Sequence, residues 1–121
     1  MATIRDRLFD ITTLPSSPGV LYANPSATKT FFSGFVLHNT AATAQVVKLY
    51  NVPDSTGSVG TAVDTGAGAN RILKIELQPD ETFILPPPPN GIVLQDLNDS
   101  IQGSATSANT VTITPQGVKD A

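Results

Sequence analysis

The sequence predicts an all-β protein: a single antiparallel β-sandwich of about eight strands, of the jelly-roll or immunoglobulin-like type. Ten prolines and nine glycines are spread along the 121 residues. No window keeps a helical apolar stripe for three turns without Pro, Gly or β-branched residues interrupting it. Short apolar segments instead recur at hairpin-like spacing. A chain of this length has room for one domain with a core of its own.

The stretch from Lys29 to Val52 carries the strongest β signal. Its two apolar runs are joined by Ala41-Ala42-Thr43-Ala44, which predicts an antiparallel hairpin. Two apolar sets alternate along the first run: Phe31, Phe35 and Leu37 on one face, and Phe32 and Val36 on the other. Because one core needs only one apolar face, the second face predicts contact with another layer or another chain.

Two later segments alternate cleanly between apolar and polar residues. The inward set predicted from this alternation is Leu73, Ile75, Leu77, Val111 and Ile113, and the outward set is Lys74, Glu76, Thr112 and Thr114. Shorter strands are expected at residues 19–23, 82–85, 92–94 and 101–106. The tetraproline Pro86–Pro89 between two of them is expected to form a rigid edge segment.

Two parts of the chain fit the sandwich less directly. Residues 1–18 form either an N-terminal arm or the first strand, with Pro15 and Pro18 marking the boundary to the sandwich domain at residues 19–121. The run from Pro53 to Asn70 is rich in Gly, Ser, Thr and Ala, which predicts one long loop. With few large apolar residues to offset the entropy of ordering, this loop is expected to be mobile and dispensable for stability.

The composition argues against several functions. Seven basic and ten acidic residues give a net charge of −3, and no Lys/Arg cluster exists, so we expect no nucleic-acid partner. The chain has no cysteine, which excludes a disulfide, a thiolate nucleophile and a cysteine zinc site. No apolar run approaches the roughly 20 residues of a membrane helix, and the N-terminus lacks the apolar region of a secretory signal. We therefore expect a soluble protein made in the cytoplasm, with no membrane partner.

Residues with catalytic potential are few. His38 is the only histidine, so one chain cannot hold a metal through two histidines. Asp96 and Asp99 lie in predicted turns, where Asp serves local hydrogen bonding. The run from Thr65 to Ala69 has two glycines but no third glycine and no following helix, so it is not a phosphate-binding loop. The sequence thus predicts no catalytic residue, no metal, no cofactor and no enzymatic activity.

Several segments together carry a resemblance to a known group of proteins. They are Phe35–Thr40, Val46–Tyr50, Ile75–Thr82, Gly91–Leu94 and Asn98–Gly103. Their patterns (hydrophobic-His/Cys-Asn-Thr, Leu-x-x-x-Glu-Thr, Gly-Asp-Ser-Ile-x-Gly and a final Thr-Val-Thr-Ile strand) resemble small virion proteins of tailed bacteriophages. Asn98 stands where that family often has Gly. The resemblance covers approximately residues 20 to 118 and implies a β-sandwich structural protein of the phage particle.

Within that family, a capsid decoration or cement protein is the expected function. Such a protein binds the head exterior and stabilises the shell, so the expected partners are the major capsid protein and other copies of itself, as a homotrimer. The expected location is the capsid exterior of the virion, which suits an acidic surface kept away from packaged DNA. The residues predicted to contact partners are apolar or aromatic: Ile4, Leu8, Phe9, Ile11, Phe32, Val36 and Tyr50.

Two alternatives remain open from the sequence. One is a receptor-facing or carbohydrate-binding module of a head or tail fibre, with the long loop and Tyr22 or Tyr50 as its binding surface. The other is a neck or tail adaptor. Binding modules usually present clustered aromatics, whereas this chain has 6% aromatic residues and no Trp. That composition favours the structural role.

Overall fold

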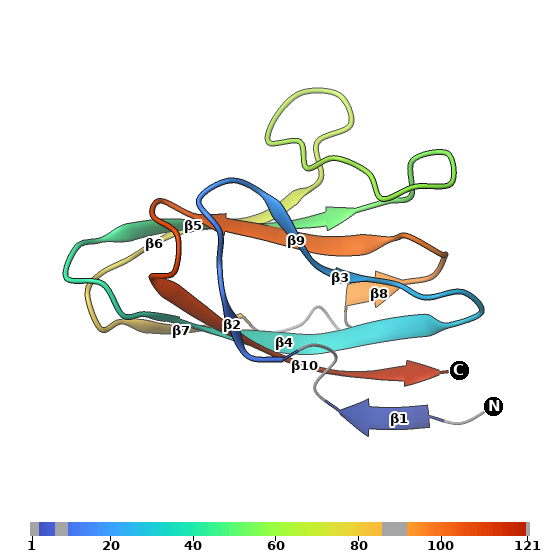
Figure 1. The fold of residues 1–121 in the computed structure, drawn as a ribbon, viewed down its shortest axis with the longest axis horizontal. Coiled ribbons are helices and arrows are strands. Elements are labelled where there is room, and N and C mark those ends of the chain that lie inside the picture. Colours follow the sequence, from blue (N-terminus) through green and yellow to red (C-terminus); the bar gives the residue numbers. More distant parts are fainter. Residues whose placement is uncertain (1–2, 7–9, 86–91, 121) are drawn as a thin grey trace.

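The computed structural model describes residues 3–6, 10–85 and 92–120. In these residues the chain is all-β, with ten strands in two antiparallel sheets that lie one above the other (Figure 1). Across the same residues there is no helix of the length and apolarity needed to cross a membrane. The tetraproline Pro86–Pro89 lies outside the described residues. The prediction of two packed antiparallel layers is confirmed.

Sheet A is the lower layer in Figure 1. Its strands are β1 (Thr3–Asp6), β2 (Thr12–Thr13), β4 (Lys29–Asn39), β7 (Thr82–Leu85), β8 (Ile92–Leu94) and β10 (Val111–Asp120). The long strands β4 and β10 pair at its centre. β1 and β2 pair with the other side of β10, and β7 and β8 with the other side of β4.

Sheet B is the upper layer, with the order β3-β9-β5-β6. Its strands are β3 (Gly19–Ala23), β5 (Gln45–Val52), β6 (Arg71–Leu77) and β9 (Ser100–Ala105). β4 and β5 therefore lie in different sheets, and the predicted hairpin is wrong. The short connection between them crosses from one layer to the other.

Asn39 explains why the chain changes layers at the end of β4. Its side chain is fully buried. Its Nδ2 donates hydrogen bonds to the backbone oxygens of Thr43 at 3.0 Å, Leu77 at 3.0 Å and Gln78 at 3.2 Å. Its Oδ1 accepts one from the backbone N–H of Ala41 at 2.9 Å. These bonds satisfy backbone groups of the β4–β5 connection and of the end of β6, so the corner can be buried.

A β-bulge changes the phase of β4. Phe32 pairs with Gly117 and Gly34 with Gln116, which leaves Ser33 as an extra residue. Gly34 has a φ of 154°, a value that glycine adopts readily. Because of the extra residue, Phe32 turns inward, is 0% exposed and stacks on Phe35 with 5.1 Å between ring centroids. The prediction that Phe32 lies on the outer face is wrong.

The core lies between the two sheets. Its buried members are Leu14, Phe32, Phe35, Leu37, Val47, Leu49, Leu77, Leu94, Ile101, Ala105, Val111 and Ile113. The predicted inward phase of β6 and β10 is confirmed, since Leu73 and Ile75 pack against this cluster as half-buried residues. Gly103 is needed for close packing, because a Cβ there would lie 2.9 Å from Leu49 and 3.1 Å from Leu14.

The N-terminal segment is part of the sandwich. β1 and β2 pair with β10 of the same chain, which matches the first-strand alternative. Leu14 is fully buried in the core, and its backbone N–H donates to the Val111 oxygen at 2.9 Å. The backbone oxygen of Pro15 accepts from Ala105 at 2.9 Å. The predicted boundary at residue 18 therefore does not separate an arm from the domain.

The long loop from Pro53 to Asn70 lies over the outer face of sheet B (Figure 1). Tyr50 and Val52 alternate with the core-facing Leu49, so they point outward, yet each is only 1% exposed. The loop covers them: the backbone oxygen of Gly60 accepts a hydrogen bond from Gln102 Nε2 at 2.9 Å. A Cβ on Gly60 would lie 2.9 Å from Val52 Cγ1. The loop therefore covers the middle of this face, at Tyr50 and Val52.

Ile113→Ala tests the core. Ile113 is 0% exposed, so we expect the substitution to lower the free energy of unfolding by about 2–5 kcal/mol, as removal of buried methyl groups does. Thr114→Ala, on the outward face of the same strand, serves as control and should cost no more than about 1 kcal/mol. Urea unfolding measures both. A loss below about 0.5 kcal/mol for Ile113→Ala would contradict the strand phase.

Replacing Ser55–Ala69 by a short Gly-Ser linker tests the loop as a cover. The sequence predicted little effect on stability, but the structure gives the opposite expectation because Tyr50 and Val52 lose their cover. We expect the Tm to fall by about 5 °C or more. Thermal unfolding followed by circular dichroism measures this. An unchanged Tm would show that the loop contributes no stabilising burial.

Candidate functional site

The carboxylate of Asp64 is the centre of a polar cluster where the loop meets sheet B. One of its oxygens accepts a hydrogen bond from the Tyr50 hydroxyl at 2.6 Å. The other lies 3.3 Å from Lys48 Nζ, and Arg71 Nη1 lies 3.8 Å from Asp64 Oδ1. Lys48 and Tyr50 come from β5 and Arg71 from β6, so a loop carboxylate holds together residues of two strands.

This contact shifts the acidity of both partners. The hydrogen bond from Tyr50 lowers the pKa of Asp64, and the nearby Lys48 and Arg71 charges act in the same direction. Burial, together with the hydrogen bond to Asp64, raises the pKa of Tyr50 to about 12. A tyrosine with this pKa stays protonated at neutral pH and donates its hydrogen bond. The cluster fits a structural role, because the bond between the Tyr50 hydroxyl and the Asp64 carboxylate holds the loop against sheet B.

Asn70 and Gln102 also hold the loop in place through hydrogen bonds. Asn70 Oδ1 accepts from the backbone N–H of Val63 at 2.8 Å, and the Asn70 N–H donates to the Val63 oxygen at 3.0 Å. Gln102 also donates to Ser100 Oγ at 3.2 Å. These polar side chains bond to the protein itself. We assign this region a structural role.

His38 lies on the outer face of sheet A. Its Nδ1 is 2.7 Å from Thr82 Oγ1 on β7, to which β4 pairs directly. No acidic side chain of the described residues is recorded as its partner. Within the described ranges, no group of three or more His, Cys, Asp or Glu residues could hold a metal ion.

The acidic residues near β9 serve turn formation. Asp99 accepts hydrogen bonds from the backbone N–H groups of Asp54 at 2.9 Å, Gln95 at 3.3 Å and Asp96 at 3.1 Å. Asn98 has a φ of 70°, in the left-handed region that favours glycine. This geometry explains why Asn, which tolerates such angles, can stand where the resembling family often has Gly.

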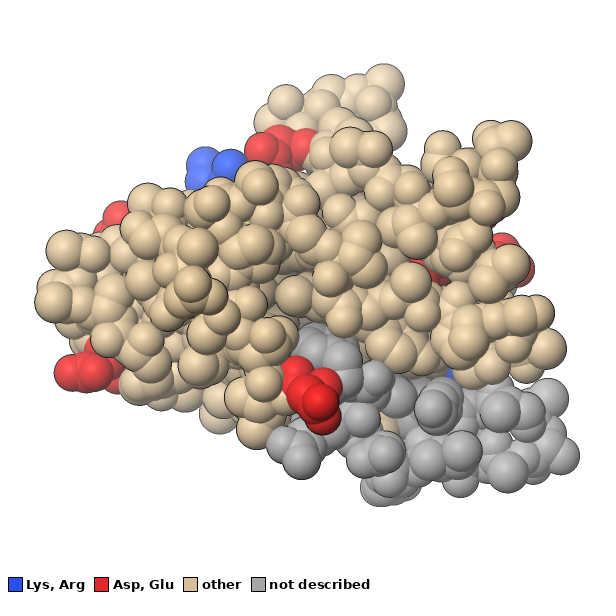
Figure 2. Space-filling view, in the orientation of Figure 1, with Lys and Arg blue, Asp and Glu red and all other residues tan. Residues whose placement is uncertain are grey.

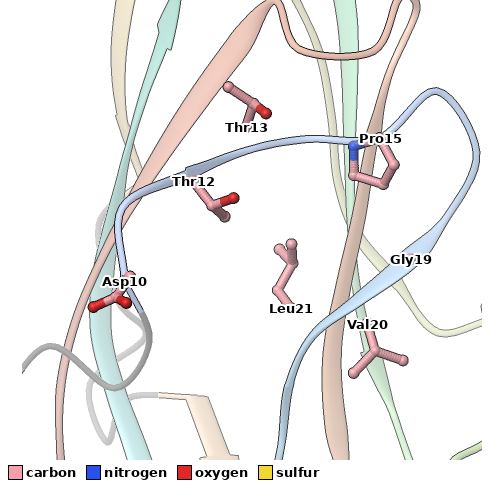
Figure 3. A pocket seen from close by; sticks show the side chains of 7 residues that line it. All are labelled: Asp10, Thr12, Thr13, Pro15, Gly19, Val20 and Leu21. Atoms are coloured by element: carbon pink, nitrogen blue, oxygen red, sulfur yellow. The ribbon is translucent and has the colours of Figure 1, made fainter.

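An open pocket of about 340 Å³ lies between residues 10–15 and the start of β3 (Figure 3). It is lined by Asp10, Thr12, Thr13, Pro15, Gly19, Val20 and Leu21. Asp10 supplies the one ionisable side chain, and the Thr13 hydroxyl already donates to Asn109 at 3.0 Å. The lining brings no set of polar groups to one point, so it defines no ligand chemistry.

The outer face of sheet A is the candidate interaction surface. Its apolar members form two cross-strand pairs, Phe31 with Val93 and Val36 with Ile84. Ile84 is 67% exposed, the highest value among the exposed large hydrophobic residues described. Thr82, Thr112 and Thr114 lie around these pairs on the neighbouring strands. Figure 2 shows the two layers from the side, and the described charged side chains visible there are few and scattered.

The structure separates the residues predicted to contact partners. Ile11 is 50% exposed, and Val36 is half-buried on the outer face of sheet A. Phe32 is in the core, and Tyr50 is covered by the loop, so neither is available to a partner and both predictions are wrong. Ile4 lies in β1, paired with Lys119. Leu8 and Phe9 lie outside the described residues.

Sequence reasoning missed Ile84 and Phe31 as members of one surface. Ile84 belongs to a four-residue strand that showed too few alternations to fix a face. Phe31 was placed on the core face because the bulge at Ser33 was not foreseen. The signal available in the sequence was Gly34 inside an otherwise apolar run, which is typical of a bulge.

Comparisons of the whole chain with protein-family models, curated proteins and solved structures give no match.

The pH dependence of stability tests the contact between Tyr50 and Asp64. Folding lowers the pKa of Asp64 from 3.8. The contribution of Asp64 to the free energy of unfolding is therefore present above pH 3.8 and is lost as the pH falls through its pKa in the folded state. Folding raises the pKa of Tyr50 from 10.0 to about 12, so its contribution is present below pH 10 and is lost as the pH rises through about 12. We therefore expect the difference in the free energy of unfolding between the wild type and Tyr50→Phe to be largest between about pH 4 and pH 10.

Tyr22→Phe is the matched control for this measurement. The Tyr22 hydroxyl is 3.1 Å from the uncharged Thr30 hydroxyl, so the effect of Tyr22→Phe should stay constant from about pH 2.5 to 7. Urea unfolding across that range gives both differences. If the Tyr50→Phe difference were equally flat, Asp64 would not be the partner that stabilises the phenol.

Proposed function

We propose that this chain is a non-enzymatic structural protein of a tailed-bacteriophage particle, of the capsid decoration or cement class. It binds the exterior of the head, and its partners are the major capsid protein and other copies of itself. The resemblance of the strand and turn segments supports the family. A shell-binding protein needs an apolar surface outside its own core, and the outer face of sheet A carries this part of the proposal.

The position of that face supports a flat, extended contact. The pairs Phe31–Val93 and Val36–Ile84 lie on three adjacent elements, β8, β4 and β7, of one sheet. Side chains at such paired positions stand close together on one side of a sheet, so each pair forms an apolar patch on this face, with Gly34 between the two patches on β4. The threonines around them can hydrogen bond at the rim of an interface, as polar rims commonly do.

The fibre or carbohydrate-binding alternative loses its proposed binding residues. Tyr50 is 1% exposed and bonded to Asp64. Tyr22 is half-buried, packs edge-on against Phe32 at 5.6 Å and bonds to Thr30. Neither ring lies open as a stacking platform for a sugar. The carbohydrate-binding role therefore lacks the aromatic contacts on which it depended.

Copy number in purified particles tests the location. A decoration protein is present in hundreds of copies per virion, because shells have many equivalent sites, whereas a neck or fibre protein is present in a few to a few dozen. Quantitative gel densitometry against the major capsid protein gives the ratio. A count in the low dozens would contradict the decoration role.

Binding to capsids that lack the protein tests the surface. Ile84→Asp places a charge on the outer face of sheet A, and we expect it to weaken binding about tenfold or more because a buried unpaired charge is costly. Val20→Asp is the control, since Val20 is 52% exposed on β3 of the other sheet. Co-sedimentation with capsids measures both. Equal binding by the two variants would exclude this face.

A further inference from the structure

Strand β6 forms an edge of sheet B. In the order β3-β9-β5-β6, no described strand lies beyond it. Its sequence is Arg-Ile-Leu-Lys-Ile-Glu-Leu, and Ile72, Lys74 and Glu76 are exposed. Open strand edges can pair with another chain through their backbone groups.

The pairing of β5 shows which backbone groups of β6 face outward. Val46 donates its N–H to Thr106 Oγ1 at 2.8 Å, on the β9 side of β5. Alternate residues of β5 therefore turn toward β6, and Val47 forms the hydrogen-bonded pair with Ile75. It follows that the N–H and C=O of Lys74 and Glu76 point away from β5, toward the open edge.

Lys74 and Glu76 form no ion pair with the described part of the chain. The two ion pairs recorded there both involve Asp64, with Lys48 and with Arg71. Lys74 lies directly opposite Lys48 on the neighbouring strand, an unfavourable placement for like charges. Glu76 accepts a hydrogen bond from Gln78 Nε2 at 3.0 Å, which leaves its charge unneutralised.

We propose that β6 pairs antiparallel with β6 of a second copy of this chain, about a two-fold axis at Ile75. This register places Lys74 of each copy opposite Glu76 of the other, as two equivalent ion pairs. It also places these residues as the hydrogen-bonded pairs, which is what their outward backbone groups require. Orientation of the backbone and complementarity of charge thus select the same register.

The inner face of β6 gains from the same pairing. Leu73 and Ile75 are half-buried, because they line the open end of the core. In the proposed register Ile75 faces Ile75 of the second copy, and Leu73 faces Leu77. Cross-strand apolar pairs of this kind lie close together and exclude water from both side chains.

The neighbouring two-fold register is disfavoured. An axis at Lys74 would also satisfy the outward backbone groups, but it would set the two Lys74 side chains directly opposite each other. A lysine on an edge strand normally prevents edge pairing for this reason. Glu76, two residues further on the same face, makes one register attractive. The pairing is therefore specific for this chain and limited to a dimer by its closed symmetry.

This inference does not rest on the proposed function, and it replaces the homotrimer expected from the sequence by a two-fold pair. Sedimentation velocity of the purified protein, from about 1 to 200 µM in low salt, tests it. We expect a concentration-dependent species of twice the mass of the 12.6 kDa chain. A monomer at all concentrations, or a trimer, would overturn the inference.

Charge reversal tests the register. Lys74→Glu and Glu76→Lys each place like charges opposite one another, and we expect each to weaken dimerisation about tenfold. The double variant Lys74→Glu/Glu76→Lys restores opposite charges and should dimerise like the wild type. Lys29→Glu, an equal charge change at an exposed position of β4, should leave dimerisation unchanged. Failure of the double variant to recover would overturn the register at Ile75.

Unfolding does not explain the expected loss. Lys74→Glu replaces a like-charge pair with Lys48 by an opposite-charge pair within the monomer, so its Tm should be equal to or higher than that of the wild type. A variant that is at least as stable and yet dissociates can only have lost the contact between copies. Dimerisation of Lys74→Glu with the affinity of the wild type would contradict the ion pairs.

Discussion

The structure depends on burying the corners at which the chain passes between its two sheets. At such a corner the backbone leaves one ladder before it enters another, and its polar groups still need partners. Asn39 supplies them at the end of β4, and Asn24 before β4, where Nδ2 donates to the backbone oxygens of Thr28 at 2.7 Å and Asp96 at 3.0 Å. In the described residues no buried side-chain nitrogen or oxygen lacks a hydrogen bond. The side-chain amides of Asn24 and Asn39 thus provide the hydrogen bonds that stabilise these corners.

These corners give a physical meaning to the motifs that carry the phage resemblance. The hydrophobic-His-Asn-Thr segment meets the Leu-x-x-x-Glu-Thr segment there: Asn39 bonds to the Leu77 oxygen, and its own N–H donates to the Glu81 oxygen at 3.0 Å. His38 and Thr82 touch across the same strands. In this chain, these segments therefore determine how the sandwich is closed. They are explained by the fold itself and say nothing of a partner.

The sequence was informative where neighbouring residues determine the outcome. The alternation in β6 and β10 predicted the buried faces, since the period of a strand is local. The prediction of a hairpin was wrong because the choice of pairing strand is not local. Residues Val46–Val52 pair with β6 and β9, which lie far along the chain. The predicted orientation of Phe32 was wrong because the extra residue at the bulge, Ser33, reverses which residues of β4 face the core.

The loop was underestimated because its anchors are polar. Pro53–Asn70 offered few large apolar residues, so burial looked too small to order it. The loop is held by hydrogen bonds from Tyr50 to Asp64 and from Gln102 to the backbone oxygen of Gly60. Tyr50 and Gln102 lie outside the loop, on β5 and β9. Composition within a segment cannot reveal partners elsewhere. The loop thus covers the middle of the outer face of sheet B, at Tyr50 and Val52, and leaves the strands at its two edges exposed. In a β6 pair, residues opposite each other point to the same side of the joined sheet. Both outer faces of sheet A would then face one way and both loops the other. Under the function proposed above, one such dimer would present two Ile84 surfaces to the same shell and bind with the combined strength of two contacts.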